Sequence, residues 1–368
     1  MDQPSVVRRV QREIEQELLP WFERNKRSMP WRRNRTPYRV WISELMLQQT
    51  RVDQATPYFN RFMQRFPSLK SLASASQEEV LKMWEGLGYY SRARNLHTAA
   101  KIICTEHAGR FPCSAEDIIK LPGIGGYTAA AIGSLAFNLD MAVLDGNVIR
   151  VLSRLFAYGK DTRTTAAKKE LQQLADDLLV KGRAGDFNES MMELGATVCT
   201  PRNPDCPACP LACCCQGKAA GNPMEFPVKA PKKKMPHIVV GAAVVQNRKG
   251  EILVAQRLQD AMLGGLWEFP GGKQEKDETI GECIVRELKE ELGINVEIGD
   301  FLVTVKHAYS HFTMDLHAYF ARIKSGRPRP IHCQDFQWLK VEDLRAIPYS
   351  KADLKIIDAL EQALSGKD

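Results

Sequence analysis

The sequence predicts a multidomain protein in which an all-α first half is joined by a short basic linker to an α+β second half. Three observations lead to this prediction. Up to about residue 217, apolar residues recur every three or four positions, as in amphipathic helices. Residues 218–236 are rich in Pro, Gly and Lys, which is typical of a linker. Beyond residue 237, several segments are β-rich and alternate between apolar and polar residues.

The composition is that of an ordinary soluble protein, with 44% hydrophobic and 26% charged residues. Its 368 residues are enough for two domains, each with its own core. Lys and Arg total 51 against 44 Asp and Glu, and the net charge of +7 permits nucleic-acid binding without establishing it. The charged N-terminus does not suit a signal peptide, and no apolar run is long enough to span a membrane. We therefore expect a cytoplasmic protein. A monomer is the default expectation.

The helical periodicity of the first half is clearest over six stretches, and strand-like runs are nearly absent there. These stretches are residues 6–22, 40–47, 57–66, 78–87, 129–136 and 168–179. Arginines are frequent in the first fifty residues, where they form either a solvated helical face or a surface for nucleic acid.

The second half combines four strand-like segments with two helices, which predicts an α+β domain built on a mixed sheet. The strands are expected over residues 237–246, 251–257, 301–309 and 312–323, and the helices over residues 280–292 and 351–364.

Six of the ten cysteines fall between Cys199 and Cys215, and four have the spacing C-x6-C-x2-C-x5-C. Those four are Cys199, Cys206, Cys209 and Cys215. Four thiolates in one short loop favour an iron–sulfur cluster. A disulfide knot needs an oxidising compartment, and structural zinc sites usually have two close cysteine pairs. Cys213 and Cys214 are spare thiols, so the ligand set could shift by one residue.

The segment LPGIGGYTA has the form of a helix–hairpin–helix turn. Gly123 and Gly125 are expected to turn the backbone tightly and to leave amide groups bare at a helix N-terminus, where phosphate can bind. About twenty residues later, Asp145 lies at the end of an apolar run and just before another helix. It is a candidate for facing a sugar, and equally a candidate helix N-cap.

Glu44 lies in a strongly apolar segment, WISELML. Burial would raise the pKa of this carboxyl and keep it protonated near neutral pH, as a general acid requires. The alternative is a glutamate on the polar face of an amphipathic helix, which the local sequence alone favours.

Together these segments resemble the helix–hairpin–helix DNA glycosylases with an iron–sulfur loop, and most closely the adenine DNA glycosylases of the MutY family. The resemblance covers nearly the whole first half. It rests on PWR at 30–32, SELMLQQTRV at 43–52, WEGLGYYSRARNLH at 84–97, LPGIGGYTA at 121–129, LDGNVIRVLSR at 144–154 and the cysteine loop.

This resemblance implies a glycosylase domain over residues 1–217, with a six-helix part at about 31–134 and a 4Fe-4S cluster part at 1–30 and 135–217. The two parts would hold double-stranded DNA, with the adenine flipped into the cleft between them. Glu44 would protonate the adenine, Asp145 would stabilise or trap the oxocarbenium ion, and Asn147 would position Asp145. Tyr127 stands where lyase-type relatives carry a lysine, which implies a monofunctional enzyme.

The resemblance also implies DNA contacts. Gln49 and Tyr89 match residues that wedge into the base stack, and Arg27 and Arg32 match contacts to the adenine pocket or DNA. Three further arginines are candidate phosphate contacts: Arg150, Arg154 and Arg202.

In the second half, every fixed position of the Nudix box G-x5-E-x7-R-E-U-x-E-E-x-G-U is filled from Gly272 onward. Glu287, Glu290 and Glu291 would lie within one helical turn, so they would repel one another unless a cation neutralised them. A divalent cation such as Mg²⁺ carrying a diphosphate is the candidate. The alternative is a solvated acidic helix eased by Arg286 and Lys289. Adenine DNA glycosylases usually carry an eroded box, so this intact one raises the question of an additional Nudix hydrolase activity.

The resemblance implies that residues 237–368 recognise 8-oxoguanine opposite the adenine. Tyr309, Ser310 and His311 match the loop that probes the damaged base, with Tyr309 in place of the usual Phe. The leading hypothesis is therefore removal of adenine mispaired with 8-oxoguanine or guanine. Two alternatives are an endonuclease III-like enzyme acting on oxidised pyrimidines and a nucleoside-diphosphate hydrolase that the helical half localises on DNA.

Overall fold

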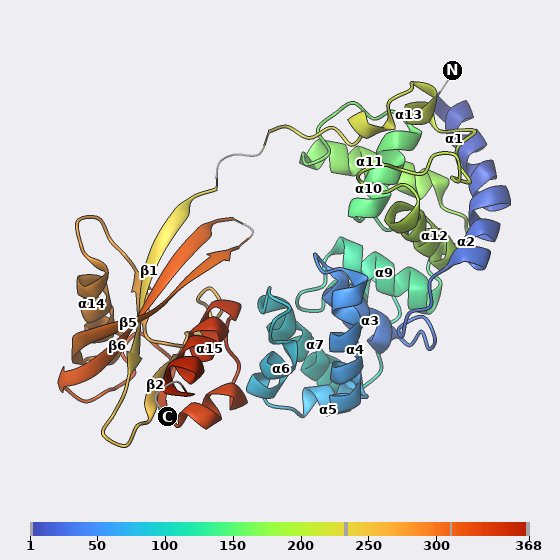
Figure 1. Cartoon of the computed structure of the whole chain (residues 1–368). Helices are drawn as coiled ribbons and strands as arrows, with labels where there is room; N and C mark the ends of the chain where they lie inside the picture. Colours follow the sequence, from blue (N-terminus) through green and yellow to red (C-terminus); the bar gives the residue numbers. More distant parts are fainter. Residues whose placement is uncertain (1–2, 232–234, 310, 366–368) are drawn as a thin grey trace. The chain divides into compact units, whose positions relative to one another are not determined.

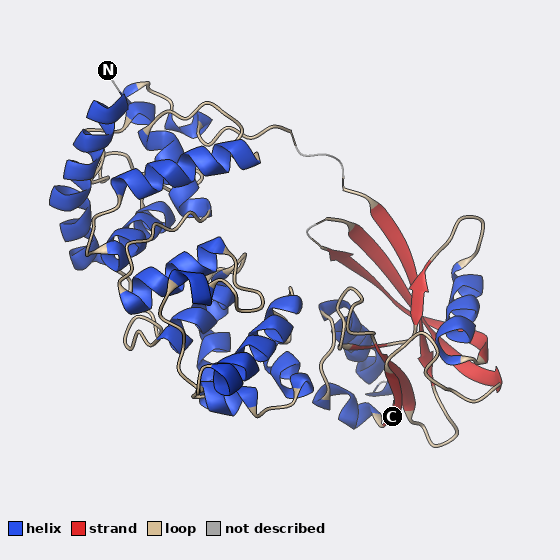
Figure 2. Ribbon diagram, turned by 180° about the vertical axis from the view of Figure 1, so that it is seen from behind, coloured by secondary structure: helices blue, strands red, loops and turns tan. Residues whose placement is uncertain are grey.

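The computed structural model describes residues 3–231, 235–309 and 311–365. The predicted fold class is confirmed, because helices make up the first half and strands begin only at His237 (Figures 1 and 2). The chain divides into two compact units, Met1–Lys70 with Ala99–Lys232, and Ser71–Thr98 with Lys233–Asp368. The second unit thus contains a segment that precedes the linker, and the domain borders at residues 217 and 237 stay a prediction.

The first unit is helical. Its helices are α1 (Gln3–Glu13), α2 (Leu19–Asn25), α3 (Pro37–Leu47), α4 (Val52–Arg65), α8 (Ala115–Ile118), α9 (Gly126–Phe137), α10 (Gly146–Leu155), α11 (Thr165–Leu178), α12 (Ala184–Thr197) and α13 (Gln216–Ala219). A π-helical segment, Ile14–Leu18, joins α1 to α2. Helices α5 (Leu69–Ala73) and α7 (Ser91–Glu106) cross the borders between the units. Apolar side chains of α1, α9, α10, α11 and α12 form one buried core, which holds these helices together.

Helix α3 explains the apolar surroundings of Glu44. It begins after Thr36, whose hydroxyl accepts a hydrogen bond from the Arg39 N–H, with Pro37 in the first turn. From Val40 to Met46 every residue is buried, so α3 is an internal helix with no wide polar face. The polar-face alternative for Glu44 is therefore wrong.

The second unit contains two sheets. Its strands are β1 (His237–Val245), β2 (Ile252–Gln256), β3 (Trp267–Glu268), β4 (Gly271–Lys273), β5 (Asn295–Ala308), β6 (Thr313–Ser325) and β7 (Asp335–Leu339). A mixed sheet has the order β4-β1-β6-β5, with β1 and β6 parallel. A second, antiparallel sheet has the order β3-β2-β7, which the sequence did not predict as separate.

Two helices cover the sheets of this unit, α14 (Ile280–Leu292) and α15 (Lys351–Ser365). The residues of β1 alternate between two cores: Ala242 and Val244 pack in the core of α15, whereas Ala243 and Val245 pack in the core of α14. Figure 1 shows α14 and α15 apart, with the strands between them. The unit also contains α6 (Gln77–Trp84) and the start of α7.

Candidate active site and nucleic-acid interface

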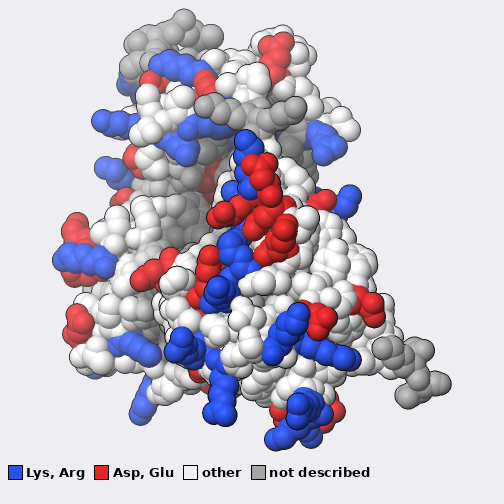
Figure 3. All heavy atoms as spheres, turned by 90° about the vertical axis from the view of Figure 1, so that its left-hand side faces the viewer, with Lys and Arg blue, Asp and Glu red and all other residues white. Residues whose placement is uncertain are grey.

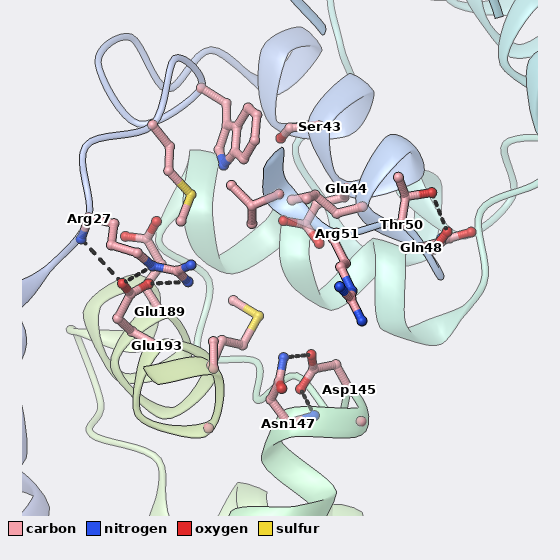
Figure 4. A pocket seen from close by; sticks show the side chains of 18 of the residues that line it. Arg27, Ser43, Glu44, Gln48, Thr50, Arg51, Asp145, Asn147, Glu189 and Glu193 are labelled. Atoms are coloured by element: carbon pink, nitrogen blue, oxygen red, sulfur yellow. Dashed lines mark hydrogen bonds and ion pairs between the residues drawn. The ribbon is translucent and has the colours of Figure 1, made fainter. Parts of the chain in front are cut away.

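A cavity of about 910 Å³ lies in the first unit. Its lining comes from α3, from the segment after α3, and from α9, α10 and α12. All four predicted catalytic residues line it: Glu44, Tyr127, Asp145 and Asn147. Figure 4 shows Glu44 on α3 facing across the cavity towards Asp145 and Asn147 at the start of α10. The fold thus brings two carboxyls together from positions about a hundred residues apart in the sequence.

Glu44 is only 6% exposed, and its carboxyl accepts a hydrogen bond of 2.6 Å from the Tyr127 hydroxyl. Burial raises the pKa of Glu44 to about 7. The Tyr127 hydrogen bond opposes this rise, and the neighbouring carboxyls of Asp145 and Glu189 add to it. A large fraction of Glu44 is therefore protonated near neutral pH, which suits a proton donor.

Asp145 is the N-cap of α10. Its carboxylate accepts hydrogen bonds from the main-chain N–H groups of Asn147 (2.9 Å) and Val148 (2.7 Å) and from the Asn147 side-chain amide (2.9 Å). Burial raises the pKa of Asp145, and these three donors limit the rise. Both candidate roles are thus compatible, because the capping hydrogen bonds also hold the anion in place beside a helix N-terminus.

Two glutamates on α12 were missed by the sequence reasoning, Glu189 and Glu193. They are four residues apart, so they lie on the same face of α12 and line the cavity. Arg32 bonds both of them, at 2.9 and 3.0 Å. Arg27 bonds Glu193 at 2.6 Å, and Arg35 bonds Glu189. Their only sequence signal is a pair of carboxylates at helical spacing in an otherwise apolar segment.

These ion pairs define the charge of the cavity wall. Burial would raise the pKa of Glu193, but Arg27 and Arg32 outweigh it and the pKa is lowered. Arg32 is therefore an internal counterion with a side chain only 12% exposed, whereas the Arg27 side chain is 42% exposed. Arg51, which was not predicted, also lines the cavity, and Figure 4 shows its side chain extending into it.

A hydrogen-bonded chain connects Asp145 to the cysteine loop. Asn147 accepts a hydrogen bond of 2.8 Å from Arg150, and the Arg150 Nε donates to the Cys199 carbonyl, also at 2.8 Å. Arg154, one turn further along α10, is 1% exposed and donates to main-chain carbonyls and to the Cys199 sulfur at 3.2 Å. The prediction that Arg154 contacts phosphate is wrong, because its side chain is buried. Arg150 lines the cavity, and its contact with phosphate stays a prediction. Arg202 is exposed.

The four predicted cysteine ligands line one small cavity, together with Arg154. Burial raises the pKa of Cys209 to about 12, and the other three thiols of the set add to the rise, which places all four near one another. All ten cysteines are free thiols, so a disulfide knot is excluded. Among the described residues, no three His, Cys, Asp or Glu side chains have the arrangement of a ready metal site.

The helix–hairpin–helix turn forms as predicted at the start of α9, but its two glycines differ. Gly123 has φ +76°, which favours glycine. Gly125 is the N-cap of α9 and is extended, so the predicted tight turn at this position is wrong. A Cβ atom on Gly125 would meet nothing within 4 Å. The N-terminus of α9 at Gly125 is therefore open to an approaching group.

Both predicted wedge residues have strained backbones. Gln49 has φ +59° and lines the cavity, and Tyr89 has φ +49° and is 41% exposed. Left-handed backbone at a residue other than glycine costs about 1–3 kcal/mol and is concentrated at functional sites. The Arg92 guanidinium lies 4.9 Å from the centre of the Tyr89 ring.

The predicted 8-oxoguanine loop joins β5 to β6, and Ser310 lies outside the described residues. Tyr309 and Phe312 have ring centres 4.8 Å apart, and His311 and Phe312 5.3 Å. Tyr309 packs against the core beneath α15, and burial raises its pKa to about 12. The Tyr309 side chain therefore supports the loop from the inside.

In the Nudix box, Arg286 bonds three carboxylates: Glu278 at 2.8 Å, Glu287 at 2.9 Å and Glu290 at 3.3 Å. The expected repulsion on α14 is thus partly relieved by Arg286. Figure 3 shows acidic and basic side chains interspersed over the side of the molecule that carries α14.

Glu291 lies apart from these pairs. Burial raises its pKa to about 8, with nearby Glu268 and Glu287 adding to the rise. Its Oε2 atom is buried and has no hydrogen-bond partner among the described residues. Burial also raises the pKa of Glu268 to about 7, although Arg257 bonds its carboxylate. Glu268 and Arg257 were missed because they precede Gly272 and are not among the fixed positions of the box.

Comparisons with known proteins agree with this architecture. Residues 42–177 match the family of HhH-GPD superfamily base excision DNA repair proteins, and residues 241–359 match the NUDIX domain. The human adenine DNA glycosylase is 35% identical over 92% of this chain and 72% of its own length. The Buchnera aphidicola (strain APS) adenine DNA glycosylase is 34% identical over 83% of this chain and 85% of its own.

Solved structures also resemble the helical part. A thermostable thymine-DNA glycosylase aligns with a TM-score of 0.53 and 28% identity, covering 58% of this chain and 98% of its own. A trapped endonuclease III–DNA covalent intermediate shares the fold, with a TM-score of 0.51, 21% identity, and coverage of 60% of this chain and 99% of its own. In the described part of the chain, no helix has the length and apolar character needed to cross a bilayer.

Proposed function

The chain belongs to the adenine DNA glycosylases, which are DNA N-glycosylases of base excision repair, and we propose that it removes adenine from mispairs with 8-oxoguanine or guanine. The observation that carries the proposal is the pair of carboxyls in one cavity. Glu44 is buried and has a raised pKa, whereas Asp145 is surrounded by N–H donors. The same cavity thus contains an acid for the leaving base and an anion for the sugar.

In the proposed reaction, Glu44 gives its proton to a ring nitrogen of the flipped adenine, so that the base leaves as a neutral molecule. The C1′–N9 bond breaks, and the deoxyribose approaches an oxocarbenium ion that Asp145 stabilises or traps covalently. Water then supplies the hydroxyl of the abasic sugar, and the proton it loses returns to the Glu44 carboxylate. Asn147 and the start of α10 keep the Asp145 carboxylate directed into the cavity.

Tyr127 limits the outcome of this reaction. Its hydroxyl is engaged with Glu44, and a phenol cannot form the Schiff base that strand cleavage by a lyase requires. We therefore expect an intact abasic site as the product. The same feature weighs against an endonuclease III-like enzyme.

We also propose that Cys199, Cys206, Cys209 and Cys215 hold a 4Fe-4S cluster. The residues fit such a group: four thiols line one cavity, and buried Arg154 beside them has no carboxylate among its hydrogen-bond acceptors in the described chain. A cluster with four thiolates would bring negative charge to this guanidinium. Its part would be to shape the loop that follows α12.

The cluster assignment is tested by measuring iron and sulfide in the purified protein and its absorbance near 400 nm. Cys209→Ser should lose iron, whereas Cys213→Ser should keep it, because Cys213 is exposed and is not part of the cavity lining. Zinc in place of iron, or full iron in Cys209→Ser, would refute the assignment.

The substrate is tested with duplexes that differ only in one pair, under single-turnover conditions. Free adenine should be released when the adenine lies opposite 8-oxoguanine or guanine, and not when it lies opposite thymine. Strands should break only after alkali treatment. A duplex with an oxidised pyrimidine tests the endonuclease III-like alternative, and base release from that duplex alone would refute our proposal.

A further part of the proposal is that residues 237–368 read the base opposite the adenine, through His311 and the loop between β5 and β6. His311 packs edge-on against Phe312 at the end of the hairpin. Replacing His311 by Ala should reduce the preference for 8-oxoguanine over guanine and leave the rate on the guanine mispair unchanged. An unchanged preference would remove His311 from the reading site.

A second candidate function, Nudix hydrolysis, is favoured by one observation. The Oε2 atom of Glu291 is buried, has no hydrogen-bond partner within residues 3–231, 235–309 and 311–365, and lies near Glu287 and Glu268, an arrangement that suits a divalent cation. The cation would hold a diphosphate, and Glu290 would be freed from Arg286 to join it. The test is Mg²⁺-dependent release of pyrophosphate or phosphate from 8-oxo-dGTP, with loss in Glu290→Gln. No release at any Mg²⁺ concentration would reject this activity.

A further inference from the structure

The turn that carries Tyr89 is held at both ends by residues 237–368, which we call the C-terminal domain. We call residues 85–90, between α6 and α7, the Tyr89 turn. Its backbone is unusual, since Gly86, Gly88 and Tyr89 all have positive φ, at +90°, +75° and +49°. A tyrosine keeps such a conformation only where the surrounding structure enforces it.

One residue of the C-terminal domain supplies that enforcement through its main chain. The Tyr349 N–H donates to the Glu85 carboxylate at 2.8 Å, and the Tyr349 carbonyl accepts from the Tyr90 hydroxyl at 3.1 Å. The same Tyr90 hydroxyl accepts from the Gly86 N–H at 3.0 Å. The first and last residues of the Tyr89 turn are thus tied to a single residue that follows them by about 260 positions.

Tyr349 is a rigid anchor. Its side chain is fully buried and stacks on Phe269 with ring centres 6.4 Å apart. The neighbouring Pro348 carbonyl accepts from the Trp267 N–H at 2.9 Å, which attaches this segment to β3. Because Tyr349 belongs to the core of the domain, it cannot move without moving the domain as a whole.

Further contacts in the same unit fix α6 beside the anchor. The Trp267 indole N–H donates to Glu78 at 2.8 Å, and the Lys82 ammonium donates both to the Ile347 carbonyl at 3.2 Å and to Glu85 at 2.8 Å. Trp267 is 2% exposed, so its indole donor and Glu78 form a pair largely protected from water. These contacts make α6 and the Tyr89 turn part of one compact body with the C-terminal domain.

We propose that Glu85, Tyr90 and Tyr349 form a latch through which the C-terminal domain holds Tyr89 in the conformation that enters the base stack. Glu85 and Tyr90 are positioning residues that act through Tyr89. The latch rests on the proposed function, in which Tyr89 is a wedge and the C-terminal domain reads the opposite base. It adds to that function a mechanical link: the domain that reads the mispair also sets the residue that opens the duplex.

The latch is tested with the full-length chain by measuring affinity for a duplex whose adenine nucleotide carries a 2′-fluoro group and resists cleavage. A 2-aminopurine placed beside the 8-oxoguanine reports unstacking through its fluorescence. Tyr90→Phe removes the hydroxyl that bonds both Tyr349 and Gly86, and Glu85→Met removes the carboxylate that bonds both Tyr349 and Lys82. Each should weaken binding ~3–10-fold, the range expected for the net loss of one or two hydrogen bonds, and should lower the 2-aminopurine signal.

Three controls accompany these variants. Glu85→Gln keeps an acceptor for the Tyr349 N–H and should restore most of the affinity. Tyr158→Phe loses a hydroxyl that donates to Glu170, away from the turn, and should bind like the wild type. Thermal melting and circular dichroism establish that each variant is folded.

The decisive measurement repeats Tyr90→Phe and Glu85→Met in a Tyr89→Ala background. If the latch acts through Tyr89, both changes lose their effect there. Equal weakening in the two backgrounds would overturn the latch, as would wild-type affinity of Tyr90→Phe and Glu85→Met. An unchanged affinity of Tyr89→Ala would also overturn the latch, because Tyr89 would then not act as a wedge. Failure of the proposed function is separate, because it appears as no adenine release by the wild type.

Discussion

Two glutamates, one in each half of the chain, have raised pKa values for the same reason but have opposite surroundings: Glu44 is buried and Glu291 is half-buried. Glu44 faces a large cavity, and its carboxyl accepts a hydrogen bond from the Tyr127 hydroxyl. Glu291 lies among other carboxylates, beside Glu268 and Glu287, and one of its oxygens is buried with no hydrogen-bond partner in the described part of the chain. Burial is the largest cause of the shift in both.

The difference teaches that a raised carboxyl pKa does not define a role by itself. A lone carboxyl beside a space for a base can hold a proton and pass it on. A carboxyl within a group of others is protonated because the charges repel, and a divalent cation relieves that repulsion equally well. We therefore assign proton donation to Glu44 and cation binding to Glu291, and three predictions separate these assignments.

The largest effect is expected from removing the acid. Glu44→Gln should lower single-turnover adenine release by roughly 10²–10⁴-fold, the usual contribution of a general acid, with little change in DNA affinity. Glu291→Gln, the matched change in the other half, should leave adenine release unchanged. Comparable losses of activity in the two variants, measured on the same 8-oxoguanine duplex, would contradict the different roles assigned to Glu44 and Glu291.

An intermediate effect is expected on the stability of the C-terminal domain. Glu291 and Glu268 ionise near pH 8 and 7 in the folded chain but near 4.5 when unfolded, so raising the pH from about 5 to 8 favours the unfolded state. We expect the free energy of unfolding to fall by about 1–3 kcal/mol across this window, which melting temperatures at each pH would show. Glu291→Gln should reduce this dependence of stability on pH. Mg²⁺ should reduce the loss of stability at high pH in the wild type but not in Glu291→Gln. A Mg²⁺ response that survives in Glu291→Gln would place the cation elsewhere.

The smallest effect is expected from Tyr127→Phe. The Tyr127 hydrogen bond lowers the pKa of Glu44, so its removal should raise that pKa further above about 7. Since the protonated acid is the active form, the excision rate of the wild type should decline as pH rises through about 7, and this decline should move to higher pH in Tyr127→Phe. A decline at unchanged or lower pH would mean that another group limits the rate.

Much of the fold was predictable because its signals are local. The periodicity of residues 280–292 and 351–364 predicted α14 and α15 almost residue for residue, and the alternation of β1 matches its two cores. The separate sheet of β3, β2 and β7 was not predictable, since β3 is a pair of residues with no pattern of its own. The extended backbone of Gly125 was not predictable either, because a glycine does not reveal its φ.

The candidate site likewise has residues that the sequence predicted and residues that it did not. Glu44, Asp145, Tyr127 and the cysteine loop could be named from motifs, and the structure brings the first three to one cavity. Arg154 was a candidate phosphate contact and is buried, and the pairing of Arg32 with Glu189 joins positions more than 150 residues apart. Neither fact has a local sequence signal.

The sequence alone determined the chemical groups of this protein and the order of its helices and strands, because motifs and periodicity are properties of neighbouring residues. Only the tertiary structure decided which of those groups are buried, which form ion pairs or hydrogen bonds, and which lie close together. The pKa of Glu44 is raised because its segment of α3 is buried, and Tyr349 bonds residues of the Tyr89 turn because segments about 260 residues apart pack together. Burial and long-range proximity set the energy of a charge, and both arise only when the whole chain has folded.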